Sequence, residues 1–196
     1  MASNKRGEQA ERRRAQLIDA ALDVFSERGV EATRISDIAE RAGVAQGLLY
    51  HYFPGKEALL RAIAERHSPL PIISSILMMP PERPARETLL DVASRVYALM
   101  QQERQAVRLA LRDILWWPTS REVVMGVREM ALGFLTRYLQ SRIDVGELRP
   151  HDTMVVGQTY ISVIFMPAVV GLPFDPYIPG AIEVILDGIA ARSPTT

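Results

Sequence analysis

The sequence contains no cysteine, and this absence removes several classes of site at once. Without thiols the chain has no disulfide, no thiolate metal ligand and no cysteine nucleophile. The apolar content of 48% is enough for a core that needs no such cross-link. A chain without cysteine fits a reducing compartment, so we expect a cytoplasmic protein.

Signals for catalysis, metal binding and export are also missing. The histidines at positions 51, 67 and 151 lack metal-ligand spacing, and no Gly-x-Ser-x-Gly or glycine-rich phosphate loop occurs. Paired acids fall on helix faces that we expect to be solvated. The sequence therefore predicts no enzyme, no cofactor and no metal site. The basic residues near the N-terminus are followed by Asp19 and Asp23 rather than by an apolar run, so no signal peptide is predicted.

An excess of charge of either sign is absent as well. The chain has 23 basic and 23 acidic residues, which argues against a protein that coats nucleic acid through bulk charge. A local basic surface is still allowed. Residues 1–14 hold five Lys and Arg against Glu8 and Glu11, so this tail could steer toward phosphate. The alternative is a solvated terminus without a partner.

What the sequence does contain is helical periodicity. Strand-like alternation is nearly absent, whereas apolar residues recur at i, i+3 and i+4, which predicts an all-α fold without internal repeats. Thr33 or Ser36 is expected to cap the second helix, and Asp152 the eighth. The expected helices are 9–28, 34–42, 45–53, 56–67, 85–102, 104–116, 120–144, 153–171 and 178–192.

The segment GVAQGLLYHYFPGKEALL, residues 43–60, carries the most informative pattern. Two short helices joined by the glycine-containing turn RAGVAQG are typical of a helix-turn-helix. A helical wheel puts Leu49 and Phe53 on an inward face, with Tyr52 beside them. The outward face carries Gly47, Leu48, Tyr50 and His51.

Those outward residues suit contact with DNA. Glycine permits close approach of the backbone, and tyrosine can stack on a base or donate to a phosphate. Lys56, at the start of the next helix, adds a cation beside backbone N–H groups that favour an anion. The alternative is that the aromatic residues are ordinary surface or packing residues.

Residues 35–60, ISDIAERAGVAQGLLYHYFPGKEALL, resemble the DNA-binding signature of the TetR family of transcriptional regulators. The first helix is similar too, so the resemblance covers roughly residues 11–62, about a quarter of the chain. GELRP at 146–150 is a weaker match. The resemblance implies an N-terminal three-helix helix-turn-helix DNA-binding domain and a larger C-terminal helical domain for ligand binding and dimerisation. The residues expected at DNA are Thr33, Arg34, Ser36, Ala45, Gln46, Gly47, Leu48, Tyr50, His51, Tyr52 and Lys56.

Three positions depart from the family pattern. Ala45 stands where a capping Ser or Thr is common, which removes about 1 kcal/mol of helix capping. Gln46 and Leu48 also replace more usual residues. These departures concern which operator sequence is bound rather than the mode of binding.

The proline content divides the chain. Residues 68–84 contain five prolines, which is typical of a connector. We therefore predict a flexible basic tail over 1–8, the helix-turn-helix domain over 9–67, the connector over 68–84, and the ligand-binding and dimerisation domain over 85–196.

The C-terminal domain is expected to bind a small, mainly apolar molecule, because aromatic residues and methionine suit an adaptable apolar cavity. Asp113 is the acidic candidate and would favour a cationic ligand; ordinary core residues are the alternative interpretation. The candidate ligand-binding residues are Asp113, Trp116, Trp117, Met125, Met130, Phe134, Tyr138, Met154, Tyr160 and Met166.

Residues 153–171 and 178–192 are expected to form a four-helix seam between two copies of the chain, since the first helix carries almost no charge. The candidate interface residues are Val163, Ile164, Ile182, Ile185, Leu186 and Ile189. The uncharged run from Thr153 to Pro173 is also long enough to span a bilayer. A membrane-anchored DNA-binding sensor is thus the alternative, although polar residues inside the run and acidic flanks favour no membrane.

The function expected from these features is that of a ligand-responsive regulator of transcription. A homodimer would bind palindromic double-stranded DNA, with its two recognition helices one duplex turn apart. The ligand would favour a spacing that does not fit the operator. Repression is expected from the habit of the family alone. A structural adaptor that uses the N-terminal domain for protein contact is a third class.

Overall fold

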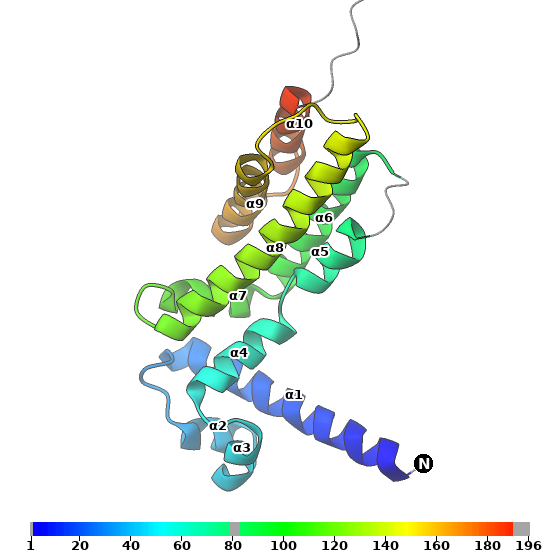
Figure 1. Cartoon of the computed structure of the whole chain (residues 1–196). Coiled ribbons are helices and arrows are strands. Elements are labelled where there is room, and N and C mark those ends of the chain that lie inside the picture. The colour runs from blue at the N-terminus through cyan, green and yellow to red at the C-terminus, as the bar shows by residue number, and fades with distance from the viewer. Residues whose placement is uncertain (1, 79–82, 190–196) are drawn as a thin grey trace, which may run out of the picture. The chain divides into compact units, whose positions relative to one another are not determined.

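The computed structural model describes residues 2–78 and 83–189, and within these ranges the chain forms ten helices and no β-strand (Figure 1). The all-α prediction is confirmed. The helix predicted over 85–102 has the same bounds in the structure. Most others differ by one to three residues at an end, as expected where terminal turns fray. The last three residues of the predicted helix 178–192 lie outside the described residues.

The chain divides into two compact units, which we call the N-terminal unit (Met1–Ser68 and Arg104–Met125) and the C-terminal unit (Pro69–Glu103 and Gly126–Thr196). The N-terminal unit is discontinuous in sequence. It contains α1 (Ala2–Arg28), α2 (Ile35–Arg41), α3 (Gln46–Tyr52), α4 (Lys56–Arg66), α7 (Arg104–Asp113) and the first turns of α8 (Pro118–Asp144). Residues 104–125, which the sequence analysis assigned to the C-terminal domain, therefore pack with the helix-turn-helix.

The core of the N-terminal unit forms around α1. Leu17, Ala21 and Phe25 are fully buried, and Leu59 of α4 and Leu109 of α7 belong to the same apolar cluster. The i, i+4 spacing along α1 puts its apolar side chains on one stripe, which is why one helix can collect several partners. The helix begins at Ala2, so residues 2–8 of the tail predicted over 1–8 form the first turns of α1 instead. Gly7 weakens these turns by only about 1 kcal/mol relative to alanine.

The C-terminal unit contains α5 (Leu70–Leu77), α6 (Ala85–Gln102), residues 126–144 of α8, α9 (Thr153–Val170) and α10 (Tyr177–Ile189). In Figure 1, α9 and α10 run side by side, and α6 packs on both of them. Helix α5 lies within the predicted proline-rich connector. It forms because Pro69 and Pro71 occupy its N-terminal positions, where proline is tolerated, while Ile73 and Leu77 bury one face.

The turn between α8 and α9 contains the GELRP segment. A carboxylate oxygen of Glu147 accepts from the backbone N–H of Ala85 at 2.7 Å, at the start of α6. The Arg142 side chain, only 6% exposed, pairs with the same carboxylate. One glutamate thus satisfies an otherwise unpaired helix N–H and a buried cation.

The next two residues of this turn fix the end of α10. Leu148 is buried, and the N–H of Arg149 donates to the carbonyl of Ile189 at 2.9 Å. The guanidinium of Arg149 donates to the carbonyl of Gly188 at 2.7 Å. A cation at the carboxyl end of a helix also interacts favourably with the helix dipole. The GELRP segment therefore connects α6, α8 and α10.

Two features decide how α9 sits in the C-terminal unit. Gly157 faces α8 so closely that a Cβ there would lie 2.9 Å from Leu132 Cδ1. The C-terminal end of α9 is capped by Gly171, with a φ of 80° that favours glycine. Close backbone approach at Gly157 places this side of α9 against α8, and the opposite side of α9 is exposed in the part of the chain that the structure describes.

The exposed surfaces of α9 and α10 are uncharged over most of their length. On α9 the exposed stripe is Val155, Thr159, Ser162, Met166 and Val170, and on α10 it is Tyr177, Gly180, Val184 and Gly188. The exposed Asp187 lies beside the α10 stripe and pairs with Arg86 at 2.7 Å. Of the interface residues predicted from the sequence, Ile164, Ile182, Leu186 and Ile189 are buried in the core of the C-terminal unit, and Val163 and Ile185 are half-buried. For α9 the physical reason is that no side of the helix carries a charge, so its sequence does not tell which stripe faces inward. On α10 the predicted residues belong to the apolar stripe that packs on α6 and α9.

Asp152 caps α9 as predicted, since its carboxylate accepts from the N–H groups of Met154 and Val155 at 2.9 and 3.1 Å. We expect Asp152→Ala to lower the free energy of unfolding by about 1 kcal/mol, because two N–H groups lose their acceptor. Asp152→Asn, which keeps an oxygen, should retain most of the stability. Urea denaturation measures both variants, and equal losses in the two would contradict the capping role.

Candidate nucleic-acid interface

The residue that caps α2 is neither of the two predicted from the sequence. Arg34 occupies the N-cap position; neither Thr33 nor Ser36 caps this helix. The N–H of Arg34 donates to the Asp37 carboxylate at 3.0 Å, and the N–H of Asp37 donates to the Arg34 carbonyl at 3.1 Å. Thr33 is buried, and its hydroxyl donates to the carbonyl of Gly29 at 2.6 Å. The Thr33 side chain therefore closes the end of α1 and does not belong to an exposed face, whereas Arg34 and Ser36 are exposed.

The turn between α2 and α3 is fixed from α1. The side-chain amide of Gln16 donates to the carbonyl of Ala42 at 2.8 Å, just after α2 ends. The guanidinium of Arg41 pairs with Glu27 at 2.7 Å, and this hydrogen bond raises the pKa of Arg41. Gly43 adopts a φ of 65°, which reverses the chain at little cost. Sequence reasoning did not find Gln16 or Arg41, because their partners lie far away in sequence.

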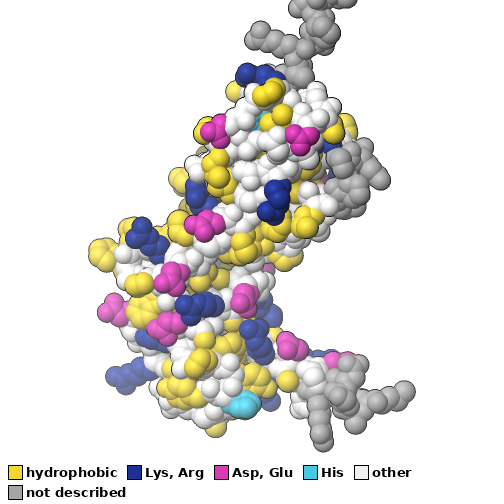
Figure 2. Space-filling view, in the orientation of Figure 1, with side chains coloured by type: hydrophobic (Ala, Val, Ile, Leu, Met, Phe, Trp, Pro, Cys, Tyr) yellow, Lys and Arg dark blue, Asp and Glu magenta, His cyan; other side chains and the backbone are white. Residues whose placement is uncertain are grey.

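Helix α3 presents the face that the helical wheel predicts. Leu49 has no exposed surface and Phe53 is 3% exposed, whereas Leu48 and Tyr50 are 37% and 49% exposed. Gly47 and His51 are exposed as well. In Figure 2, hydrophobic side chains and a histidine lie over this part of the N-terminal unit. The helix has no side-chain cap at Ala45, as expected.

The aromatic side chains at the end of α3 form a row. His51 and Tyr52 meet edge to face, with ring centroids 5.5 Å apart, and Tyr52 lies 6.5 Å from the Phe53 ring. At the other end of the row, the guanidinium of Arg14 lies over the Phe53 ring, 5.4 Å from its centroid. These contacts restrict Tyr52, which is half-buried, to few orientations.

Lys56 is engaged inside the protein. Its ammonium donates to the carbonyls of Val30, Glu31 and Thr33 at 2.7, 3.1 and 3.1 Å. An ammonium has three protons, so these contacts use its whole donor capacity. The phosphate contact expected of Lys56 stays a prediction, and it would require exchange of one of these partners.

The predicted ligand-binding residues fall into both units. Asp113, Trp116, Trp117 and Met125 lie in the N-terminal unit, and the other six lie in the C-terminal unit. Trp116 is 82% exposed, and Met130, Met154 and Met166 are about half-exposed. Tyr138 and Tyr160 are buried, and Phe134 packs against the core of the C-terminal unit.

The interior cavity found among the described residues of the C-terminal unit has a volume of only ≈ 10 Å³. This space holds at most about one water molecule. Tyr160 is the predicted residue that reaches it; the hydroxyl donates to the Leu89 carbonyl at 2.5 Å, and burial raises the pKa of this tyrosine well above its usual value. The lining residues are Leu89, Leu135, Leu139, Val156, Tyr160, Ile182, Ile185 and Leu186. A drug-sized ligand would need this core to open.

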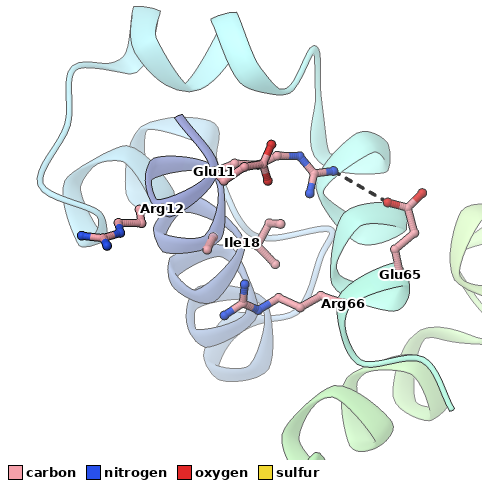
Figure 3. Close-up of a pocket in the computed structure, with 7 residues that line it drawn as sticks. Glu11, Arg12, Ile18, Glu65 and Arg66 are labelled. Carbon is pink, nitrogen blue, oxygen red and sulfur yellow. Dashed lines mark ion pairs between the residues drawn. The ribbon is translucent and has the colours of Figure 1, made fainter. Parts of the chain in front are cut away.

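A larger hollow of ≈ 520 Å³ lies between α1 and α4 (Figure 3). It is open to solvent and lined by charges of both signs. Arg14 and Glu65 form an ion pair across it at 3.7 Å. The lining residues are Glu11, Arg12, Arg14, Ala15, Ile18, Glu65 and Arg66. This hollow offers no apolar enclosure and does not resemble a site for an apolar ligand.

Comparison with known proteins connects this geometry to a family. Residues 17–63, from the buried stripe of α1 to the middle of α4, match the family model of bacterial regulatory proteins of the tetR family. The chain is also 30% identical over 136 residues to the fatty acid metabolism regulator protein of Bacillus subtilis (strain 168), covering 64% of this chain and 68% of that protein. The chain belongs to the TetR family. The resemblance inferred from residues 35–60 is thus confirmed.

Other TetR-family relatives match more locally. The transcriptional repressor KstR2 of Rhodococcus jostii (strain RHA1) is 47% identical over 51 residues, which cover 26% of this chain and 25% of KstR2. Several relatives match over only about a quarter of their own length. Among solved structures, a SmeT–triclosan complex has a TM-score of 0.74 at 24% identity, covering 94% of this chain and 96% of that one. That likeness shows the fold: an N-terminal helix-turn-helix and a larger helical C-terminal domain.

Proposed function

We propose that this TetR-family protein is a homodimeric regulator of transcription that binds a palindromic site in duplex DNA and is released by a small, mainly apolar ligand. The observation that carries the proposal is the division of α3 into two faces. Leu49 anchors the helix in the core, while Gly47, Leu48, Tyr50 and His51 form an exposed surface. A helix that presents such a surface fits the major groove.

Selection from a library of random duplexes tests this proposal. We expect enrichment of a palindrome whose half-sites are about 10 base pairs apart, centre to centre, or a multiple of that distance. Enrichment of no palindrome would sink the DNA-binding proposal. Capture of a protein through the same surface, with no selected duplex, would favour a structural adaptor.

Gly47 gives a test with opposite effects on folding and binding. A Cβ at this position would meet no atom of the protein within 4 Å. We therefore expect Gly47→Ala to stabilise the fold by about 0.5–1 kcal/mol, because alanine favours helix more than glycine does. The same methyl group should weaken DNA binding if the backbone of α3 approaches the bases. Thermal unfolding and fluorescence anisotropy measure the two effects. Gly126→Ala on α8, where a Cβ also meets nothing, is the matched control; unchanged DNA affinity in Gly47→Ala would contradict close approach.

The homodimer is proposed to form through the exposed stripes of α9 and α10. Support comes from their lack of charge and from Val184, which is 75% exposed. Two copies of α9 and α10 would bury these stripes in a four-helix seam. The half-buried Val163 and Ile185 would lie at its edges.

The uncharged exposed surface of α9 is also compatible with the alternative of a membrane-anchored sensor. Within the described residues, α9 is the one helix long and apolar enough to cross a bilayer. Gln158, Thr159 and Ser162 on its exposed side, and the acidic residue Asp152 at its start, favour a protein partner over lipid. A protein that partitions with membranes and leaves them only in detergent would support the anchored sensor instead.

The ligand is proposed to be mainly apolar, with at most one polar group. Support comes from the near-absence of charge along α9 and from the relatives, one named as a regulator of fatty acid metabolism and another solved with triclosan. The cationic variant is disfavoured because Asp113 already pairs with Arg112 at 3.2 Å. A thermal-shift panel should include triclosan, long-chain alcohols and fatty acids, hydrophobic cations and hydrophilic anions.

The panel separates the ligand classes when each hit is also tested for release of the selected duplex. We expect the apolar compounds to stabilise the protein and to release DNA. Hits confined to hydrophilic anions would overturn the proposed ligand class. Cation hits that Asp113→Asn abolishes would support the cationic variant, and stabilisation without release would refute the switch.

A further inference from the structure

Trp117, in the turn between α7 and α8, covers the side chain that links the two ends of the helix-turn-helix. The ammonium of Lys56 lies 5.2 Å from the centroid of the Trp117 ring. A cation over an indole face is stabilised by the ring quadrupole, and tryptophan is the best of the aromatic side chains at this. Trp117 also packs against the core of the N-terminal unit. The contact joins residues 61 positions apart, so no local sequence pattern predicts it.

The backbone that carries the Trp117 indole is held by hydrogen bonds on both sides. The backbone N–H of Trp117 donates to the carbonyl of Asp113 at 2.8 Å, and the backbone carbonyl of Trp117 accepts from the N–H of Arg121 at 3.2 Å. Pro118 follows directly as the first residue of α8, which fixes the backbone further. The ring therefore projects from a backbone held on both sides, which lowers the entropy cost of placing it over Lys56.

Helix α7 is itself anchored to α1. Ala106 and Leu109 are buried in the core that α1 shares. The guanidinium of Arg112 donates to the carbonyls of Phe25 and Ser26 at 2.6 and 3.0 Å, at the last turn of α1. A cation at this end of a helix satisfies carbonyls that have no partner within the helix. The turn that carries Trp117 thus has a defined position relative to the helix-turn-helix.

Lys56 lies where the two ends of the DNA-binding segment meet. It is the first residue of α4, directly after α3 and the Pro54-Gly55 turn. Its carbonyl partners belong to residues 30–33, the connection that leads from α1 into α2. The single ammonium therefore links the segment before α2 to the segment after α3. Movement of this link would change the orientation of α3 on the protein.

We propose that Trp117 and Lys56 form a positioning pair for DNA binding: the indole holds the Lys56 ammonium on the carbonyls of residues 30–33, and this fixes α3 for the groove. The proposal rests on the proposed function as a DNA-binding regulator. It gives Lys56 a role inside the protein in place of a phosphate contact. It also makes Trp117, which lies far beyond the helix-turn-helix in sequence, a residue that controls DNA affinity without touching DNA.

The salt dependence of DNA binding separates the two roles of Lys56. Each phosphate contact contributes about −0.9 to the slope of log affinity against log salt concentration. With the duplex selected by the wild type, we expect Trp117→Leu and Lys56→Ala each to weaken binding about tenfold without changing this slope. The double variant should be no weaker than the single ones, because both remove the same link. Trp117→Phe keeps an aromatic face and should recover most of the affinity.

The matched control is Leu115→Ala, which removes an exposed apolar side chain from the same turn and should leave affinity and slope unchanged. A slope that falls by about one unit in Lys56→Ala, with Trp117→Leu binding as tightly as the wild type, would overturn the proposal and restore the phosphate contact. Circular dichroism checks that each variant is folded. If Trp117→Leu does not fold, the DNA affinity of Trp117→Phe still tests the proposal.

A second measurement tests the contact without DNA. The chain has two tryptophans, so Trp116→Phe leaves Trp117 as the sole indole. Adding Lys56→Ala to this variant should shift the emission maximum of Trp117, because the ring loses its cation. An unchanged spectrum would overturn the pair. A wild type that selects no duplex, in contrast, would refute the proposed function, whatever the spectrum shows.

Discussion

Glutamate in place of Val184 is expected to convert the proposed dimer into monomers and to weaken binding of a palindromic duplex by about 10²–10⁴-fold. Val184 is the most exposed apolar side chain on α10 and lies on its uncharged stripe. In a two-fold symmetric seam each protomer contributes the same residue, so one substitution buries two carboxylates. The binding loss follows because a monomer holds one half-site and loses the gain from linking the two.

Sedimentation equilibrium and DNA titration check this expectation on the same samples. Ser94→Glu, an exposed position on α6 of the C-terminal unit, is the matched control for added charge. It should leave both the oligomeric state and the affinity unchanged. A Val184→Glu protein that still sediments as a dimer would show that the seam lies elsewhere, and the stripes of α9 and α10 would then need another partner.

Removal of the Glu147 carboxylate is expected to cost about 3–5 kcal/mol of unfolding free energy. Glu147→Ala removes the carboxylate that pairs with the Arg142 guanidinium, which is 6% exposed, and leaves the N–H of Ala85 without its acceptor. A buried charge that loses its partner is far more costly than an exposed one. Urea denaturation of wild type and variant gives the difference directly.

Two further variants show whether the buried pair is the cause. Glu129→Ala, at an exposed position on α8, should change the stability by less than about 0.5 kcal/mol. Replacing both members, as Arg142→Met with Glu147→Leu, should recover part of the loss, because no unpaired charge remains. If Glu147→Ala is no less stable than Glu129→Ala, the pair contributes nothing to folding.

The sequence was most informative where one side of a helix faces the core and the other faces solvent. The helical wheel of α3 and its C-cap Phe53 separates Leu49 and Phe53 from Gly47 and His51, because so short a helix has only one buried face. Asp152 was found for a similar reason, since the rules for helix caps depend only on neighbouring residues. The DNA-facing surface is thus a local property.

What the sequence did not reveal depends on contacts between distant segments. Helix α7 joins the N-terminal unit through Leu109 and Arg112, and neither residue differs in type from those of an ordinary amphipathic helix. Lys56 has a motif position that suggests phosphate, but its carbonyl partners lie 23–26 residues earlier. For α9 the difficulty is different: the helix has no charged residue, and apolar residues lie on its exposed side as well as its buried side, so periodicity does not tell which side faces inward.

The discontinuity of the N-terminal unit bears on how regulators of this kind are recombined. A chimera that joins residues 1–68 to the ligand-responsive part of another protein would separate α1 from the α7 that caps it. The carbonyls of Phe25 and Ser26 would then face a foreign helix in place of Arg112, and Lys56 would lose the indole above it. Transplanting residues 104–122 together with residues 1–68 keeps both contacts. The unit of exchange for DNA specificity is therefore two pieces of chain rather than one.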